Sequence, residues 1–442
     1  MNVSVHKYIM GSTAVEISHS IESALREGRL TPGDPLPTVR ALSQARRVSP
    51  ATVASAYRTL RERGLLVAQG RRGTRISPRP PLYTRTRAPV PQNAVNLAAG
   101  NPDPALLPRL APALKRLDPE PRLYAEELML PQLLRLSRRG FERDGIPADT
   151  LAVVGGALDG IERVLGSHLR RGDRVALEDP AFSGVLDLLS ALGLVAEPVA
   201  IDERGPLPGA LETTLRRGAQ ALIVTPRAQN PTGAALDPAR VRALGRVLRA
   251  YPEVLIIEDD HAGPVAGVPA YTLCDSSRAR WAVVRSVSKS LGPDLRLAVL
   301  SGDAATVARV EGRQLLGIRW VSHLLQRLVV ELWTERGMAN RLKRAERSYS
   351  QRREALLAAL GKHGIEARGR SGLNVWVPVP EEANVVSYLL ECGWAVVAGE
   401  RYRIESPPAI RITTATLEPS DAEPLAADLA RALGPTGRTS EV

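Results

Sequence analysis

One lysine in this chain stands among residues that together could hold an aldehyde cofactor. Lys289 comes shortly after the apolar run Trp281 to Val284, with Ser286 and Ser288 before it and Arg296 seven residues after it. A lysine amine forms a Schiff base with an aldehyde, while hydroxyls and a guanidinium fork bind phosphate. The spacing therefore predicts a site for an aldehyde that carries a phosphate, whereas an isolated Ser-x-Ser-Lys would only be a solvated strand end.

An earlier apolar run is also followed directly by polar residues, which here are carboxylates. The run Val254 to Ile257 leads into Glu258, Asp259 and Asp260. A carboxylate at the tip of a buried strand is costly unless a cation neutralises it. The protonated nitrogen of a pyridine ring is such a cation, and an ionised aspartate beside it keeps the ring electron-withdrawing. We assign Asp259 to this role in preference to its neighbour Asp260.

Three further segments each contain residues that could contact the same cofactor. The run Ala221 to Val224 leads to Asn230 in an Asn-Pro-Thr-Gly turn, where its amide could bond a ring oxygen. Phe182 follows Glu-Asp-Pro-Ala and could stack on a pyridine face, or it could be a core aromatic. Gly156 and Ala157 open a helical pattern, whose first N–H groups are free to bind phosphate.

These motifs, in this order, resemble fold-type I pyridoxal-phosphate enzymes of the aspartate aminotransferase group, over roughly residues 96 to 436. The resemblance implies that Lys289 is the Schiff-base lysine. It implies the following further roles: Asp259 at the pyridine nitrogen, Asn230 at the 3′-oxygen, Phe182 on the ring face, and Ser286, Ser288 and Arg296 on the phosphate. Tyr124 matches the tyrosine that reaches the phosphate of the neighbouring subunit, and Arg411 matches the arginine that binds an amino-acid carboxylate.

The sequence departs from that pattern at two positions. The group usually carries a tyrosine two or three residues after the aspartate, and here those positions are His261 and Ala262. A serine or threonine expected in the phosphate turn is Gly155. Cofactor binding can survive both changes, so His261 is kept among the cofactor contacts, but turnover of amino acids is expected to be reduced.

The positive charge is concentrated at the N-terminal end. The chain of 442 residues carries a net charge of +12, of which residues 1–76 contribute +7 and residues 77–95 another +3. The remaining residues carry only +2, so a generally arginine-rich composition does not explain the pattern. Basic charge gathered at one end is typical of nucleic-acid binding.

Three short helical patterns and a hairpin are predicted in this basic segment. The first helix spans Val15 to Leu25, and a rigid Pro-rich turn leads to a second helix from Thr38 to Ala45. A third begins at Ser49 and Pro50, because serine is a good N-cap and proline suits the first helical position. The runs Leu65 to Val67 and Thr74 to Ile76 could pair around the Gly-Arg-Arg-Gly of residues 70–73.

Residues 28–40 match the G-x-L-x-P-G-D-x-L-P-[ST]-x-R signature, apart from Pro35, so the segment resembles a GntR-type winged helix. A plain three-helix interaction domain is the alternative. In a helix-turn-helix the start of the third helix faces DNA bases, and the wing reaches phosphate or the minor groove. The candidate DNA contacts are Arg40, Ser49, Pro50, Thr52, Arg71 and Arg72.

The remainder of the chain predicts an α/β fold behind a linker. Residues 78–95 contain five prolines and form a semi-extended spacer, so we expect a winged helix at 1–77, a linker at 78–95 and a cofactor domain at 96–442. Apolar runs alternate with helical patterns, which predicts a mostly parallel sheet with a smaller C-terminal α+β part. The expected strands are 175–177, 221–224, 254–257, 282–284, 297–300, 373–378 and 411–414.

A winged helix joined to an aminotransferase-like body is similar to MocR-type transcription regulators. Residues 225–233, 259–261, 286–296 and 320–326 look especially like PtsJ-type regulators, which are associated with vitamin B6 salvage. The resemblance implies a DNA-binding homodimer that meets an operator with two half-sites and senses pyridoxal phosphate or an amino compound. The alternatives are an active aminotransferase that carries a DNA-binding head and a passive DNA-binding protein without cofactor.

Composition is consistent with a soluble, cytoplasmic protein. No apolar run approaches the roughly 20 residues of a membrane span, and no signal-peptide pattern is present. Cys274 and Cys392 are the only cysteines, so neither a disulfide framework nor a metal cluster is expected.

Overall fold

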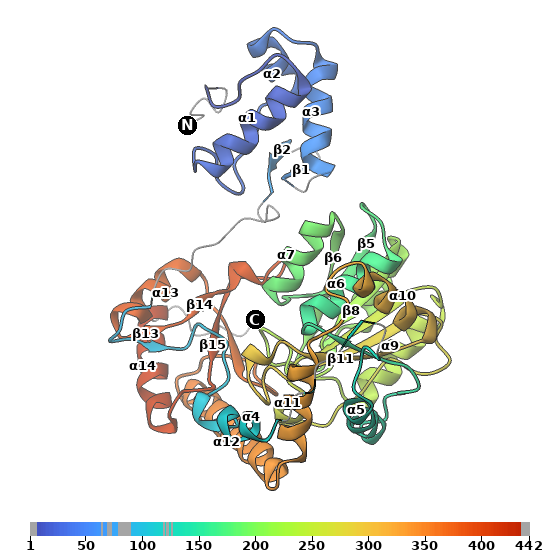
Figure 1. Cartoon of the computed structure of the whole chain (residues 1–442). Helices are drawn as coiled ribbons and strands as arrows, with labels where there is room; N and C mark the ends of the chain where they lie inside the picture. The colour runs from blue at the N-terminus through green and yellow to red at the C-terminus, as the bar shows by residue number, and fades with distance from the viewer. Residues whose placement is uncertain are drawn as a thin grey trace. The chain divides into compact units, whose positions relative to one another are not determined.

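The computed structural model describes most of the chain as two compact units, each treated separately below (Figure 1). The described residues are 7–62, 65–68, 73–77, 90–117, 120, 123–124 and 127–434. Among them, no helix is both long and apolar enough to cross a membrane.

The N-terminal unit is a three-helix winged helix. Its elements are α1 (Ala14–Arg26), α2 (Val39–Arg46), α3 (Pro50–Glu62), β1 (Leu66–Ala68) and β2 (Thr74–Ile76). The two strands pair antiparallel, with Leu66 opposite Ile76. The apolar faces of the helices form a small core, in which Ile17, Val53 and Leu60 are fully buried. The predicted helices and the wing hairpin are confirmed.

Side-chain caps fix where these helices begin. Thr13 and Glu16 form a reciprocal capping box at the start of α1. Thr38 accepts a hydrogen bond from the backbone of Ala41 at the start of α2. Ser49 accepts one from the backbone of Thr52, as expected for the N-cap of α3.

The larger unit is built on an eight-stranded sheet in the order β4-β11-β10-β9-β8-β5-β6-β7. Strands β5, β8, β9 and β10 run parallel to one another, whereas β11 is antiparallel to both β10 and β4. The strands are β4 (Leu151–Val154), β5 (Arg174–Asp179), β6 (Val195–Asp202), β7 (Gly205–Pro206), β8 (Ala219–Val224), β9 (Leu255–Asp260), β10 (Trp281–Ser286) and β11 (Ala298–Gly302).

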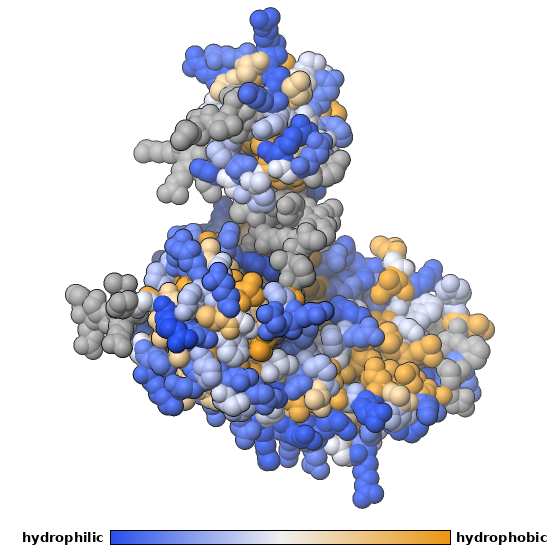
Figure 2. Space-filling view, turned by 90° about the vertical axis from the view of Figure 1, so that its left-hand side faces the viewer, coloured by the Kyte–Doolittle hydropathy of each residue, from blue (hydrophilic) through white to orange (hydrophobic). Residues whose placement is uncertain are grey.

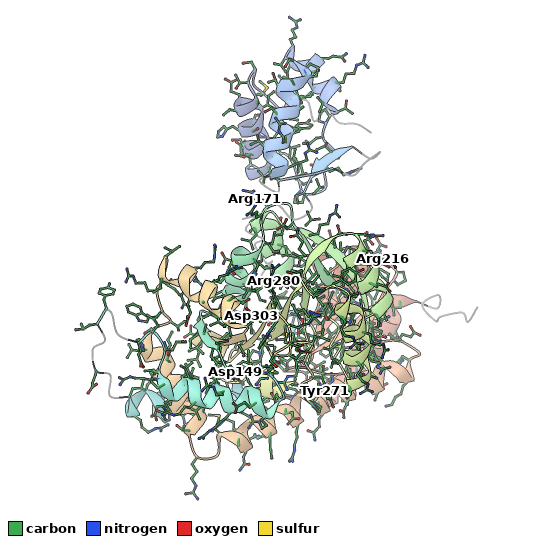
Figure 3. The ribbon with its side chains drawn as sticks, turned by 90° about the vertical axis from the view of Figure 1, so that its right-hand side faces the viewer. Asp149, Arg171, Arg216, Tyr271, Arg280 and Asp303 are labelled. Carbon is green, nitrogen blue, oxygen red and sulfur yellow. The ribbon has the colours of Figure 1, made fainter. Side chains whose placement is uncertain are left out.

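Register brings the ends of distant strands to one edge of this sheet. Val154 lies opposite Ala298, which lies opposite Ser286, so the residues that follow β4, precede β11 and follow β10 are neighbours. The other edge is marked in Figure 3 by Asp149, which precedes β4, and by Asp303, which follows β11. Parallel strands of this kind gather ligand-binding loops at their carboxyl ends.

Helices cover the sheet, and a smaller C-terminal part follows them. The helices of the first half are α4 (Leu110–Arg116), α5 (Pro131–Arg143), α6 (Ala157–His168), α7 (Ser183–Leu192), α8 (Pro208–Arg216) and α9 (Pro238–Arg249). Those of the second half are α10 (Ala304–Leu315), α11 (His323–Thr334), α12 (Met338–Lys362), α13 (Glu382–Glu391) and α14 (Ala422–Leu433).

The C-terminal part has its own small sheets and core. Strands β12 (Asn374–Pro378), β15 (Ala409–Thr413) and β14 (Val397–Ala398) pair in that order, and β13 (Trp394–Ala395) pairs with β3 (Val95–Asn96). The apolar faces of α12, α13 and α14 enclose this sheet. The predicted α/β class, with a mostly parallel sheet and an α+β part, is confirmed, although β4 and β6 were not predicted.

Candidate cofactor site and nucleic-acid interface

The loop between β10 and β11 carries both Lys289 and Arg296. Its ends are joined by the β10–β11 ladder and by a hydrogen bond from the Val287 amide to the Leu297 carbonyl, 3.2 Å. Arg296 has a φ of 41°, a left-handed conformation that is uncommon for a residue with a side chain. The lysine and the arginine singled out in the sequence are therefore held on one closed hairpin.

The Lys289 amine lies in a buried and electropositive environment. Its Nζ donates a hydrogen bond to the Gly100 carbonyl, 2.7 Å. Burial, followed by the Arg411 cation, lowers the pKa of Lys289 to about 8, although the negative charge of Asp259 opposes the shift. A lysine with a depressed pKa supplies much more neutral amine at neutral pH, and the neutral amine is the nucleophile.

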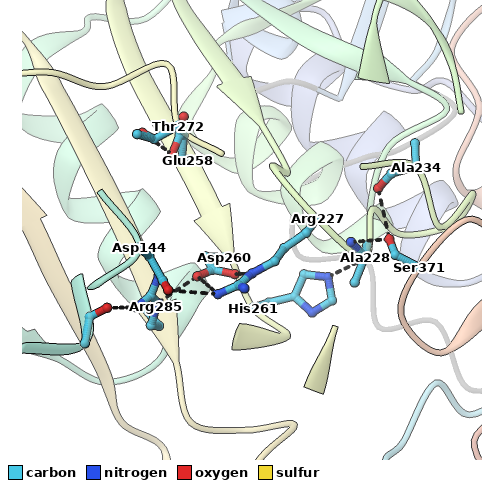
Figure 4. Close-up of polar contacts among 11 residues, drawn as sticks. Asp144, Arg227, Ala228, Ala234, Glu258, Asp260, His261, Thr272, Arg285 and Ser371 are labelled. Atoms are coloured by element: carbon cyan, nitrogen blue, oxygen red, sulfur yellow. Dashed lines mark hydrogen bonds and ion pairs between the residues drawn. The ribbon is translucent and has the colours of Figure 1, made fainter. Parts of the chain in front are cut away.

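Asp259 and Asp260 are adjacent on β9, and they have opposite surroundings because neighbouring strand residues face opposite sides of a sheet. Asp260 binds two arginines: its Oδ1 lies 2.8 Å from Nε of Arg227 and its Oδ2 lies 2.7 Å from Nε of Arg285 (Figure 4). Asp259 Oδ1 is buried and has no hydrogen-bond partner among the described residues. Asp259 is therefore the carboxylate with capacity for a ring nitrogen.

The two carboxyl groups also differ in acidity. Burial alone would raise the pKa of Asp260, but the charges and hydrogen bonds of Arg285 and Arg227 hold it well below its usual range. Burial, followed by the negative charge of Asp260, raises the pKa of Asp259 to about 7, although the charge of Lys289 opposes the shift. A cation placed at Asp259 would restore its ionised form.

The candidate phosphate groups meet at the start of α6. The backbone N–H and side-chain hydroxyl of Ser288 both lie within hydrogen-bond distance of the Ser286 hydroxyl. Arg296 donates to the Gly155 carbonyl and lies next to Gly156, whose φ of 110° favours glycine. Ala157 is the first residue of α6. These groups form a cradle of hydroxyl, guanidinium and helix N-terminus, which suits an anion.

Asn230 and Arg411 contact each other across the larger unit. Arg411, which is almost fully buried on β15, donates to Oδ1 of Asn230, 3.2 Å, and to the Ala98 carbonyl. Its guanidinium also stacks on the Tyr402 ring, 5.0 Å from the ring centre. A Cβ at Gly100 would lie 3.3 Å from this guanidinium, and the φ of 67° at Gly100 also favours glycine. The arginine predicted for a carboxylate is thus held in place beside the residue predicted for the ring oxygen.

His261 follows Asp260 and turns toward the Asn230 turn. Its Nε2 lies 3.0 Å from the Ala228 carbonyl, which can only accept, so Nε2 carries the proton (Figure 4). Burial, followed by the charge of Lys289, lowers the pKa of His261 to about 4. The ring is therefore neutral at physiological pH, and its Nδ1 is left as a hydrogen-bond acceptor.

The two aromatic candidates lie in different settings. Phe182 is half-buried just after β5. Tyr124 is 75% exposed, and its ring packs edge-on against Trp320, 5.8 Å between centres. The guanidinium of Arg319 also lies over the Tyr124 ring, 5.3 Å from its centre. An exposed Tyr124 does not reach the Lys289 site of its own chain by any contact in the described part of the structure.

Two buried charged residues near the site were not predicted as functional from the sequence. Glu178, at the end of β5, is buried, and its Oε2 accepts from the Thr225 amide. Burial is the main cause that raises the pKa of Glu178 to about 8; hydrogen bonds to Thr225 oppose the shift, and the negative charge of Asp259 supports it. The argument applied to Asp259, a carboxylate closing a buried strand, could have identified it. Arg227 was visible in the sequence, but nothing there indicated its pairing with Asp260.

The DNA-binding candidates that the structure describes lie near the start of α3. Arg40 on α2 is exposed, as are Ser49 and Pro50, while Thr52 is half-buried and hydrogen-bonded to Ser49. Arg71 and Arg72, and residues 78–89 of the predicted linker, lie outside the described residues. Within the described part of the chain, no group of three or more His, Cys, Asp or Glu could hold a metal ion.

Two protein-family models match the chain. Residues 13–76 match the bacterial regulatory proteins of the gntR family, and residues 92–429 match the aminotransferase class I and II family. A solved structure of LysN, the α-aminoadipate aminotransferase of Thermus thermophilus complexed with N-(5′-phosphopyridoxyl)-L-leucine, superposes with a TM-score of 0.69 at 25% identity. That comparison covers 77% of this chain and 92% of LysN.

Two transcription regulators are similar to this protein over most of the chain. The vitamin B6 salvage pathway transcriptional repressor PtsJ of Salmonella typhimurium is 40% identical over 96% of this chain and 99% of its own length. The pyridoxine biosynthesis regulator PdxR of Corynebacterium glutamicum is 28% identical over 79% of each chain. The protein therefore belongs to the MocR-type regulators, in which a gntR-family DNA-binding domain precedes an aminotransferase class I and II domain.

Proposed function

We propose that this protein is a transcription regulator that binds pyridoxal phosphate in its aminotransferase-like domain and controls genes of vitamin B6 metabolism. The observation that carries the proposal is a buried Lys289 amine near the Asp259 carboxylate, in a chain that begins with a winged helix. The names of PtsJ and PdxR support the vitamin B6 connection. We take the winged helix as 1–77, the linker as 78–95, the cofactor domain as 96–442, and the cytoplasm as the location.

The residues of the site fit this cofactor. Lys289 would bind its aldehyde carbon, Asp259 its ring nitrogen, and Asn230 with neutral His261 its 3′-oxygen. The cradle of Ser286, Ser288, Gly156, Ala157 and Arg296 would bind its phosphate, with Phe182 beside the ring. Bound there, the cofactor would supply an aldehyde that reacts with amines and a ring that withdraws electrons. Asp159, which accepts from the Gly155 amide, occupies one N–H that a phosphate could have used.

The DNA surface is proposed on the N-terminal unit. The exposed start of α3, with Ser49 and Pro50, would enter the major groove, while Arg40 contacts a base or a phosphate. No acidic residue lies in the first turn of α3, so its positive N-terminus is open to the phosphate backbone. Arg71 and Arg72 remain predicted wing contacts.

We propose that the protein is a homodimer, because cofactor binding and operator binding would both use two subunits. Figure 2 shows hydrophobic surface gathered on one side of the larger unit, and strongly exposed apolar side chains include Leu114, Leu123, Leu315, Leu316, Ile318 and Leu324. Exposed apolar surface of this extent is typical of an interface. Tyr124 stands among these residues in the sequence and would reach the partner's phosphate. Two-fold symmetry would then present two winged helices to two half-sites.

The effector is proposed to be pyridoxal phosphate itself or an amino compound that reacts with it. Arg411 is the candidate for the carboxylate of such a compound, although Asn230 and Ala98 already accept hydrogen bonds from its fork. An active aminotransferase that carries a DNA-binding head is not favoured, because His261 and Ala262 stand where the related enzymes have a tyrosine.

The decisive experiment measures binding of the full chain to its own upstream DNA, with and without pyridoxal phosphate, at a stated salt concentration. Lys289→Ala should lose the visible absorption band of the bound cofactor and the cofactor-dependent change in DNA affinity. Its basal DNA affinity should be retained, because the winged helix is unaltered.

Two results would reject the proposal. One is a visible band that persists unchanged in Lys289→Ala, and the other is DNA affinity that is identical with and without cofactor in the wild type. Sustained production of keto acid from amino acids by the wild-type protein would instead favour the aminotransferase alternative.

A further inference from the structure

A second cavity lies in the larger unit, separate from the Lys289 site. It measures about 540 Å³ and is enclosed by α5, the end of α11, the start of α12 and the end of β10. Lys289, Asp259, Asn230 and Arg411 are not among the residues that line it. A cavity of this size is within the range of small-molecule sites. We name it the α5–α12 pocket.

The floor of the α5–α12 pocket is a buried network of arginines and carboxylates. Arg285 lies with its Nε 2.7 Å from Asp260 and its Nη2 2.8 Å from Asp144, and its Nη1 donates to the Gly140 carbonyl (Figure 4). Arg227 reaches the same two carboxylates. The guanidinium of Arg285 also lies 4.6 Å from the centre of the Phe141 ring. Two cations thus face two carboxylates, so the floor is neutral overall.

The mouth of the pocket carries the excess charge. Arg143 at the end of α5 and Lys343 on α12 are exposed and line the cavity, against the single carboxylate of Glu346. The walls between floor and mouth are apolar, with Phe141, Trp333 and Leu342 among them. A net cationic mouth above an apolar body favours a ligand with one anionic group on a flat hydrophobic skeleton.

We propose that the α5–α12 pocket binds a small carboxylate with an aromatic or branched apolar body. Its carboxylate would lie at Lys343 and Arg143, and its body would pack between Phe141 and Trp333. This inference goes beyond the proposed function and does not depend on it, because none of the cofactor-ring or carboxylate candidates takes part. It has one structural link to that function: Ser286, a phosphate candidate, also lines the pocket, directly after Arg285 on β10.

Isothermal titration calorimetry on the full chain tests the proposal. The protein is first saturated with pyridoxal phosphate, so that a carboxylate cannot enter the phosphate cradle, and Arg411→Met, which removes the other carboxylate candidate, should bind the probes normally. The probes are benzoate, phenylacetate and indole-3-acetate, each paired with its neutral amide. At least one carboxylate should bind with a dissociation constant of about 1 mM or tighter, and about tenfold more tightly than its amide.

Matched variants locate the binding. Lys343→Glu should weaken the tightest probe about tenfold or more, whereas Arg344→Glu makes the same change of charge on an exposed α12 residue outside the pocket and should change affinity less than about twofold. Ala339→Trp, at an exposed lining position, should block the cavity while far-UV circular dichroism stays unchanged. Lys289→Ala should bind the probe normally.

The proposal is overturned if no carboxylate binds more tightly than its amide, or if Lys343→Glu and Arg344→Glu weaken binding equally. Loss of probe binding in Lys289→Ala would also overturn it, since the probe would then occupy the cofactor site. That last outcome leaves the proposed regulator function standing, so the two hypotheses fail separately.

Discussion

The depressed pKa of Lys289 predicts how cofactor capture depends on pH. Only the neutral amine attacks an aldehyde. With a pKa of about 8, roughly 9% of the amine is neutral at pH 7 and roughly 91% at pH 9. The capture rate should therefore rise about tenfold over this interval and level off above pH 8, whereas an ordinary lysine would give a rise of about a hundredfold without levelling.

Stopped-flow mixing of cofactor-free protein with pyridoxal phosphate, followed at the visible band, measures this rate. Arg411→Met should move the bend of the rate profile to higher pH, because it removes a cation that lowers the pKa of Lys289. Arg411→Lys keeps the charge and should leave the bend close to that of the wild type. If the logarithm of the capture rate instead rises by about one unit per pH unit up to about pH 9.5, as expected for a lysine with an ordinary pKa, the reasoning is refuted.

Three further outcomes are expected. Asp260→Asn leaves Arg227 and Arg285 short of one buried negative charge and should lower the free energy of unfolding by about 3–5 kcal/mol in urea titrations, whereas a loss under about 1 kcal/mol would show that the network is solvated. Glu178 has a raised pKa of about 8 against 4.5, so the folded cofactor-free protein should lose stability as pH rises from 4.5 to 8; Glu178→Gln should flatten that slope, and an unchanged slope would contradict it. Arg40→Ala should weaken operator binding by about 1–3 kcal/mol in fluorescence anisotropy, while Arg216→Ala, which removes an equally exposed charge on α8, serves as the control and should have no effect.

The strand ends of the larger unit were predictable because buried strands have short, purely apolar sequences. The runs that end before Asp259 and Lys289 read as strands bounded by polar residues, and the structure has β9 and β10 there. Strand β6 was hidden because Glu197 and Pro198 interrupt its apolar pattern, and proline is rare inside a sheet. The winged helix was recognisable from its caps and its turn signature.

The ion pairs between residues on different strands could not be predicted from the sequence. Asp260 and Arg285 are neighbours because β9 and β10 are adjacent and in register, and Arg227 joins them from the segment after β8. No spacing along the chain encodes these contacts. The neutral state of His261 likewise depends on burial and on the nearby Lys289, which only the folded arrangement provides. The sequence could name candidate residues for the site, but it could not give the protonation states that burial and neighbouring charges impose on them.

The closed hairpin that carries Lys289 and Arg296 has a consequence for timing. One loop, tied at both ends to a buried sheet, would hold the aldehyde and the phosphate of the same molecule. A ligand gripped at two points by a preformed element loses little conformational freedom on binding, and it leaves only when both contacts break together. Release would then be slow compared with changes in supply. The occupancy of such a regulator would follow the cofactor concentration averaged over the time needed for release, and it would not respond to shorter fluctuations.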